Sequence, residues 1–194
     1  MPPAVRALIV VNVLVFLLEL AAPDPMMRLF ALWPLATPQF RPWQVISYAF
    51  LHDPHNLLHI CLNMFALFMF GRALEAYWGA RRFLVFYLVC VLTAALTQLA
   101  VQYGSSANQE VIGASGGIFG VLLAFAWYFP RQRILLLFPP IPMPAWLFVT
   151  VYGLLELLFG VSGIEPGVAH FAHLGGLAGG ALCILYWRMR HRFN

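Results

Sequence analysis

Four polar side chains stand within stretches of the sequence that are otherwise apolar, and together their types could carry out acyl transfer. Ser115 lies in the run GASG, and His173 lies in the run AHLGG. A serine hydroxyl becomes a nucleophile when an adjacent base takes its proton, and histidine is a common base. His59 and Asn63 are four residues apart, so they would share one face of a helix. The set predicts a Ser115 nucleophile that is activated by His173.

The remaining polar groups could stabilise the oxyanion that forms when a serine attacks a peptide carbonyl. If a helix begins at Ser115, its first backbone amides have no acceptor within the helix. The side chains of His59 and Asn63 could supply further donors. Each residue also has a plainer explanation, because polar side chains join membrane helices and small residues let helices pack closely.

The segments that would hold these residues are apolar enough to cross a lipid bilayer. The chain has 194 residues, of which 62% are hydrophobic and 9% charged, a composition that excludes a soluble globular domain. A bilayer core of about 30 Å needs about 20 apolar helical residues. The sequence predicts an all-α membrane protein, a single domain over residues 1–194. Its six transmembrane helices are expected at residues 4–22, 55–74, 83–101, 115–129, 144–159 and 168–187.

Arginine supplies all the positive side-chain charge and is distributed unequally. Nine of the 11 arginines lie at one end of the predicted helices, and two, Arg28 and Arg41, lie at the other. Basic residues favour the cytoplasmic side, so both termini are expected there. The net charge of +4 then reflects topology and contact with lipid headgroups rather than nucleic acid, for which the chain has no motif.

The polar candidates are also expected at one depth in the bilayer. Counted to the arginine that closes each predicted helix, His59 is 13 residues away, Ser115 is 16 and His173 is 15. At about 1.5 Å per residue, the three lie roughly 20, 24 and 22 Å above the inner boundary. The sequence therefore predicts one polar layer below the outer surface.

Three motifs together resemble those of the rhomboid family of intramembrane serine proteases. The run FLH at residues 50–52, followed by HICLN at residues 59–63, is similar to the family's histidine and asparagine pattern. GASG at residues 113–116 and AHLGG at residues 172–176 match the family's nucleophile and base motifs. The match extends from Trp43 to the glycines of the last predicted helix.

The resemblance implies a six-helix bundle that cleaves transmembrane or juxtamembrane segments of other membrane proteins. Ser115 and His173 would form a catalytic dyad, with His59 and Asn63 assisting at the oxyanion and with no metal or cofactor. The supporting residues implied are His52, Gly113, Gly116 and Phe119, the last of these placed against the catalytic histidine. The expected partners are lipid and transmembrane substrates, and the expected location is the bacterial inner membrane.

Some positions leave more than one role open. His55 competes with His52, and His170 is a rival base one turn before His173. Glu156, in the fifth predicted helix, is expected to face the wet outer end or to bond a loop, with gating or orienting as the alternative. The resemblance implies a structural hydrogen-bonding role for Glu75.

The sequences of two connecting loops lead to further expectations. Trp43-Gln44 replaces a Trp-Arg pair that is frequent in the family's first loop. The connection at residues 160–167 is rich in glycine and is expected to be mobile and to cover the site. The fifth helix is expected to move when a substrate enters, as the resemblance suggests.

Three other functions compete with a serine protease. A membrane zinc protease would carry His-Glu-x-x-His, but the run at residues 55–59 is HNLLH and lacks the glutamate base. A rhomboid-like protein without enzyme activity would lack the serine or the histidine, and this chain has both. A transporter or proton channel would need more acidic groups in the polar layer.

Overall fold

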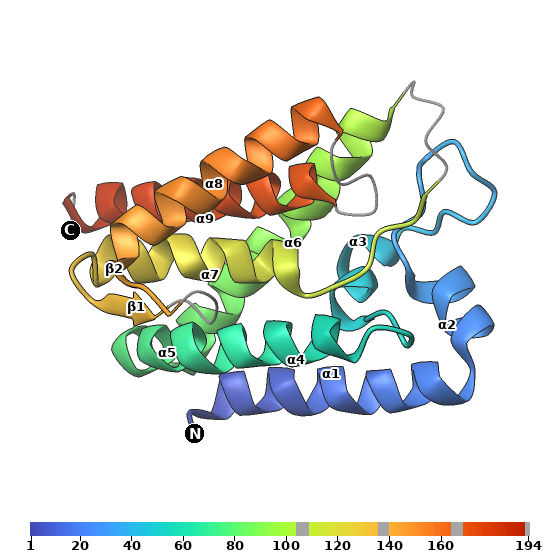
Figure 1. Ribbon diagram of the computed structural model, residues 1–194, viewed down its shortest axis with the longest axis horizontal. Helices are drawn as coiled ribbons and strands as arrows, with labels where there is room; N and C mark the ends of the chain where they lie inside the picture. The colour runs from blue at the N-terminus through green and yellow to red at the C-terminus, as the bar shows by residue number, and fades with distance from the viewer. Residues whose placement is uncertain (104–108, 136–139, 164–168, 193–194) are drawn as a thin grey trace.

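Helices account for the apolar stretches of the sequence, as the computed structural model shows (Figure 1). The structure describes residues 1–103, 109–135, 140–163 and 169–192. Its long helical segments are α1 (Pro3–Ala21), α4 (Leu57–Ala66) continued through a π-helical turn (Leu67–Gly71) into α5 (Arg72–Trp78), α6 (Ala80–Gln102), α7 (Ser115–Tyr128), α8 (Ala145–Ser162) and α9 (His170–Arg192). The prediction of an all-α membrane bundle is confirmed, and each predicted segment corresponds to one of these.

Among the residues that the structure describes, four segments are long and apolar enough to cross a membrane, namely α1, residues 57–78, α6 and α8. α9 has histidines in its first turn and arginines in its last turns, and it falls outside this group. α7 is also apolar but has only 14 residues. A helix of that length spans about 21 Å, less than the bilayer core of about 30 Å. At least one end of α7 therefore lies below the membrane surface.

Glycines let α9 approach α6 and α7 closely. A Cβ atom at Gly175 would lie 2.6 Å from Thr97 Oγ1 of α6, and one at Gly176 would overlap the carbonyl oxygen of Gly116 in α7. At Gly116 itself, a Cβ would lie 2.6 Å from the Cβ of Ala94. Small residues at such contacts are typical of membrane helices. They bring the start of α7 against the start of α9.

α8 lies beside α9 at the edge of the bundle (Figure 1). All of its residues are described, and only Ala145, Val149 and Glu156 are buried. Most of the other apolar side chains of α8 are exposed, as expected of a helix in contact with lipid, although Phe148 packs against the core. A carboxylate is thus one of the few groups that α8 turns toward the protein interior.

The connection between α1 and α4 is folded rather than extended. It contains α2 (Pro23–Phe30), α3 (Gln44–Ser47) and a 3₁₀ turn (Tyr48–Phe50), and Leu32 forms an isolated β-bridge with Val111. The connection between α7 and α8 contains two short antiparallel strands, β1 (Arg133–Leu135) and β2 (Pro142–Pro144).

Gln44 anchors the first of these connections, at the position where the family often has arginine. Its side chain is fully buried. The Oε1 atom accepts hydrogen bonds from the amides of Arg41 at 3.1 Å and Trp33 at 3.4 Å. The Nε2 atom donates to the carbonyls of Gln39 at 3.0 Å and Leu29 at 3.3 Å. A neutral amide therefore holds the loop together.

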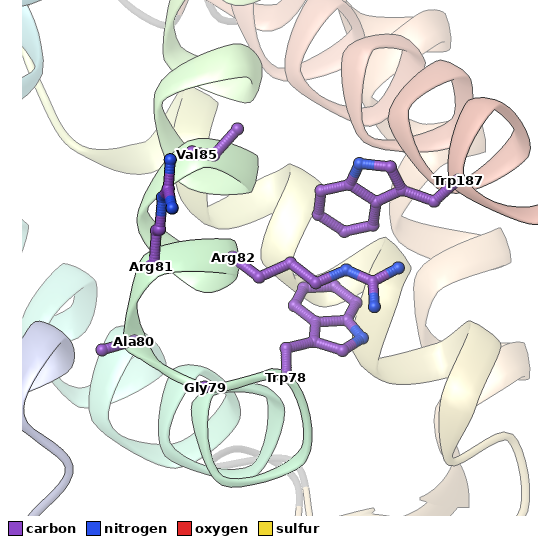
Figure 2. A pocket seen from close by; sticks show the side chains of 7 residues that line it. All are labelled: Trp78, Gly79, Ala80, Arg81, Arg82, Val85 and Trp187. Atoms are coloured by element: carbon purple, nitrogen blue, oxygen red, sulfur yellow. The ribbon is translucent and has the colours of Figure 1, made fainter. Parts of the chain in front are cut away.

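A pocket of about 480 Å³ lies at the opposite end of α7 from Ser115 (Figure 2). The turn from Trp78 to Arg82 lines it together with Val85 and Trp187, and the Arg82 guanidinium lies 4.2 Å from the centre of the Trp187 ring. Trp78 packs on Tyr128, the last residue of α7, with ring centroids 5.3 Å apart. The pocket is thus about 20 Å from Ser115, one α7 length away.

Glu75 joins α5 to the first turn of α1, in the hydrogen-bonding role that the resemblance implies. Its carboxylate accepts the amides of Ala4 at 2.8 Å and Val5 at 2.7 Å, two donors that have no acceptor within α1. Hydrogen bonds to a charged group contribute about 1.5–3 kcal/mol each.

We predict that Glu75→Gln lowers the thermal unfolding temperature of the protein in detergent micelles, because one amide loses its charged acceptor. The free energy of unfolding is expected to decrease by about 1–3 kcal/mol. Asp24→Asn, a change of the same kind at an exposed position of α2, is the control and should leave the unfolding temperature unchanged. Equal unfolding temperatures for all three proteins would contradict the prediction.

Candidate active site

Ser115 and His173 meet across the contact between α7 and α9. Ser115 is the first residue of α7, and His173 lies in the first turn of α9. The Nε2 atom of His173 is 2.8 Å from the Ser115 Oγ, a hydrogen-bonding distance. His173 is buried and Ser115 is half-buried. The structure thus brings together two residues that are 58 positions apart in the chain.

Phe119 holds the plane of the His173 ring. It lies one turn after Ser115 in α7, and its ring stacks on the imidazole with centroids 4.3 Å apart and an angle of 12° between the planes. The contact implied by the family resemblance is therefore present. Stacking fixes the plane of the imidazole against α7.

His59 lies beside Gly113, with its Nε2 atom next to the Cα that also neighbours the serine. A Cβ atom on Gly113 would lie 2.8 Å from His59 Nε2 and 3.6 Å from Ser115 Oγ. The His59 Nδ1 atom accepts a long hydrogen bond of 3.4 Å from the amide of Asp53. With Nδ1 as acceptor, Nε2 carries the proton and is free to donate.

Gly113 also has a backbone conformation that other residues rarely adopt. Its φ angle is +119°, and its amide donates to the carbonyl of Tyr48 at 3.0 Å. Glycine alone reaches this region without strain. Gly113 is therefore required twice, for its φ angle and for the space that His59 occupies.

Asn63 lies on the same face of α4 as His59. Its side chain is buried, and the Nδ2 atom donates to the carbonyl of His59 at 2.8 Å, within the same helix. One amide proton is thus committed to the helix backbone. The second Nδ2 proton takes no part in this bond, so it could be donated to an oxyanion without breaking it.

His52, and not His55, packs against His59. His52 is fully buried, with its ring edge-on to His59 and centroids 5.0 Å apart, whereas His55 is exposed. The His52 amide donates to the Glu19 carboxylate at 3.0 and 3.1 Å. Burial, with a smaller contribution from His59, lowers the pKa of His52 to about 3, so its ring is neutral. Sequence reasoning missed Glu19, although an acid near the end of an apolar helix was a signal.

Glu156 contacts both histidines at the start of α9. Its Oε2 atom lies 2.7 Å from His170 Nδ1 and 2.9 Å from His173 Nδ1. The expectation that Glu156 faces the wet outer end or bonds a loop is wrong, because only 9% of the residue is exposed and it faces α9. His170 pairs with this carboxylate rather than with Ser115, so His173 is the histidine next to the serine.

The same three side chains could hold a metal ion. Within the described parts of the chain, the potential ligand atoms of Glu156, His170 and His173 lie within 4.8 Å of one another. Two histidines and one glutamate also form the ligand set of some catalytic zinc sites. The short carboxylate contacts can equally be satisfied by protons on the two rings.

The connection between α8 and α9 begins later than the sequence suggested. α8 continues through Ser162, and Gly163 ends it with a φ angle of +66°. Residues 160–162, expected in the mobile loop, are therefore helical. The expected cover over the site falls on residues 164–168, which lie outside the described residues.

The fold and the site define a helical membrane protein with a serine–histidine pair at a buried helix start. The Rhomboid domain model matches residues 39–190, and the chain belongs to the rhomboid family. The chain is 32% identical over 146 residues to Rhomboid protein 1, mitochondrial, of Saccharomyces cerevisiae, covering 73% of this chain and 40% of that protein. It is 29% identical over 169 residues to Rhomboid protease AarA of Providencia stuartii, covering 78% and 58%.

A third relative matches almost the whole chain. Rhomboid protease GlpG of Klebsiella pneumoniae is 24% identical over 188 residues, which are 92% of this chain and 60% of that protein. The chain thus spans 40 to 60% of the length of these three relatives.

We predict that Gly113→Ala lowers the rate at which a fluorophosphonate probe labels Ser115 by about tenfold or more, the scale of a displaced active-site group. The added Cβ would displace His59 and strain the backbone next to the serine. Gly79→Ala is the control, since Gly79 also has a positive φ angle but open space around its Cα. Equal labelling rates for the two variants would contradict the role given to Gly113.

Proposed function

We propose that the chain is an intramembrane serine endopeptidase in which Ser115 is the nucleophile and His173 the general base. The observation that supports this most directly is the 2.8 Å contact between His173 Nε2 and Ser115 Oγ at the start of α7. General-base catalysis needs contact at this distance. Two of the relatives are named rhomboid proteases, which supports a protease activity.

The chemistry proceeds in two halves. His173 Nε2 takes the proton of Ser115 as Oγ attacks the carbonyl carbon of the scissile peptide bond. The tetrahedral intermediate collapses when the same proton passes to the departing amine, which leaves an ester on Ser115. Water, deprotonated by His173, then attacks the ester, and the second product leaves as His173 returns the proton to the Ser115 Oγ.

The oxyanion would be met by donors from two helices. The Ser115 amide lies in the first turn of α7, where amides have no acceptor within the helix. His59 Nε2–H faces the same space across Gly113. Asn63 would contribute the second proton of its Nδ2 group while the first stays bonded to the His59 carbonyl. Donors of this kind lower the barrier most where water is excluded.

The substrates we propose are transmembrane or juxtamembrane segments of other membrane proteins. Because α7 is shorter than the bilayer core, a serine at its outer end is submerged and reaches peptide bonds near or within the membrane. The two ends of the bundle differ in arginine content, which supports cytoplasmic termini and an active site opening to the other side. We further propose that residues 1–194 form one protease domain in the bacterial inner membrane.

A zinc protease is the second candidate, and one observation favours it. Glu156, His170 and His173 could coordinate a metal ion. In that case the activity would be lost with a chelator and retained without Ser115. The dyad mechanism instead requires that activity be retained with a chelator and lost without Ser115.

We predict that Ser115→Ala abolishes cleavage of a helix-destabilised transmembrane substrate in liposomes. The thermal unfolding temperature of the protein should stay unchanged. His173→Ala should behave in the same way, and phenanthroline should leave the wild-type rate unchanged. Ser162→Ala, which removes an exposed serine at the end of α8, is the matched control. Undiminished cleavage by Ser115→Ala would overturn the proposed function.

We predict smaller losses at the oxyanion donors. His59→Ala should lower kcat by about 10- to 1000-fold, the scale of one oxyanion donor, with less change in KM. Asn63→Ala should cost less than His59→Ala, because the Asn63 amide is already bonded to its own helix. His55→Ala, at an exposed position in the turn before α4, should leave kcat unchanged. A reversed order of the first two variants would count against these roles.

A further inference from the structure

Glu156 is a buried carboxylate on a helix that otherwise faces outward. Only two other residues of α8 are buried, and both are small and apolar. The mechanism proposed above, built on Ser115 and His173, does not use Glu156. A buried acid in a membrane helix is costly unless its partners offset the loss of water. The partners of Glu156 are the two histidines of α9, His170 and His173.

The three groups form a line from carboxylate to serine. Glu156 Oε2 is 2.9 Å from His173 Nδ1, and His173 Nε2 is 2.8 Å from Ser115 Oγ. Both nitrogens of one imidazole are thus engaged, one by the carboxylate and one by the hydroxyl. The first contact is short but not aligned as a regular hydrogen bond, since His173 Nδ1 has no such partner within the described residues. A small rotation of either side chain would align it.

Stacking alone does not determine which edge of the His173 ring faces the serine. Phe119 fixes the ring plane, but a half-turn about the bond to the ring keeps that plane and points carbon atoms at Ser115. A carboxylate beside Nδ1 favours one of these two orientations. It also favours the tautomer with the proton on Nδ1, which leaves the Nε2 lone pair for the serine.

His170 holds the carboxylate in place. Its Nδ1 atom forms a regular hydrogen bond of 2.7 Å with the same Oε2 atom, and its side chain is almost fully buried. The carboxylate is therefore fixed between two rings on one helix face, three residues apart. The arrangement joins α8 to the start of α9.

We propose that Glu156 is a positioning residue for His173, so that the site works as a Ser115–His173–Glu156 triad rather than a dyad. The inference rests on the proposed function and deepens it. Glu156 accepts the Nδ1 proton of His173 and orients the ring. It remains ionised while Nε2 takes the serine proton, and it stabilises the imidazolium that forms.

The test compares Glu156→Gln with Glu156→Asp in liposomes. A glutamine amide would donate to Nδ1 and place the ring proton on Nε2, where it blocks the base. We expect kcat to fall by about 10- to 1000-fold in Glu156→Gln, less than in soluble triads because the contact is not aligned, with KM within about twofold. Labelling of Ser115 by the fluorophosphonate probe should slow by the same factor. Glu156→Asp, which keeps the carboxylate, should recover part of both rates.

Two further variants separate positioning from simple bracing of α8. Val149→Ala removes another buried contact of α8 and should lower the unfolding temperature without changing kcat. His170→Gln should lower kcat by about two- to fivefold, which is less than one kcal/mol, because the carboxylate remains beside His173. If Glu156→Gln lowers the unfolding temperature but leaves kcat and labelling unchanged, Glu156 is only a brace and the proposal is wrong.

The remaining outcomes distinguish this proposal from the function on which it rests. If a chelator removes activity and added zinc restores it, the three residues bind a metal and the triad is overturned. If Ser115→Ala still cleaves, the serine mechanism itself fails, whatever Glu156→Gln does. If Ser115→Ala is inactive and Glu156→Gln is as fast as wild type, the dyad stands and only the triad is overturned.

Discussion

A polar group inside a bilayer must find its partner within the protein, because lipid offers neither donors nor acceptors. Three buried acids obey this constraint in three ways. Glu75 accepts two amides at the start of α1, Glu19 accepts the amide of His52, and Glu156 lies between two imidazoles. The first two join a helix to a neighbouring segment. Only Glu156 has a partner, His173, that also contacts Ser115, and for this reason we propose a positioning role in the chemistry for Glu156 alone.

The same constraint explains why so many glycines surround the site. Ser115 and His173 can meet only if the backbones of α7 and α9 approach closely, and side chains at Gly120 and Gly176 would prevent this, because each would collide with a carbonyl oxygen of the other helix. Displacing a reacting group by about 1 Å can lower the rate of the catalysed reaction about 100-fold. Packing residues that contact no substrate thus determine whether Ser115 and His173 come into contact.

Sequence patterns predicted the helices and the contact between Ser115 and His173, since long apolar runs and three motifs are local signals. The packing direction of α8 was not such a signal, because its apolar residues surround the helix, and so the partner of Glu156 was predicted wrongly. Spacing favoured His52 but left His55 as a competitor, and burial separates the two. The ends of α5 and α9 extend past the predicted spans because helices continue into water, where apolar composition no longer marks them.

Gln44 anchors the first loop with four hydrogen bonds from an uncharged side chain. An arginine at this position would be attracted to lipid phosphates and would respond to ionic strength. An amide neither titrates nor pairs with headgroups. The four contacts that Gln44 makes in this loop are therefore insulated from the salt, the acidity and the lipid charge of the surface on which the loop lies.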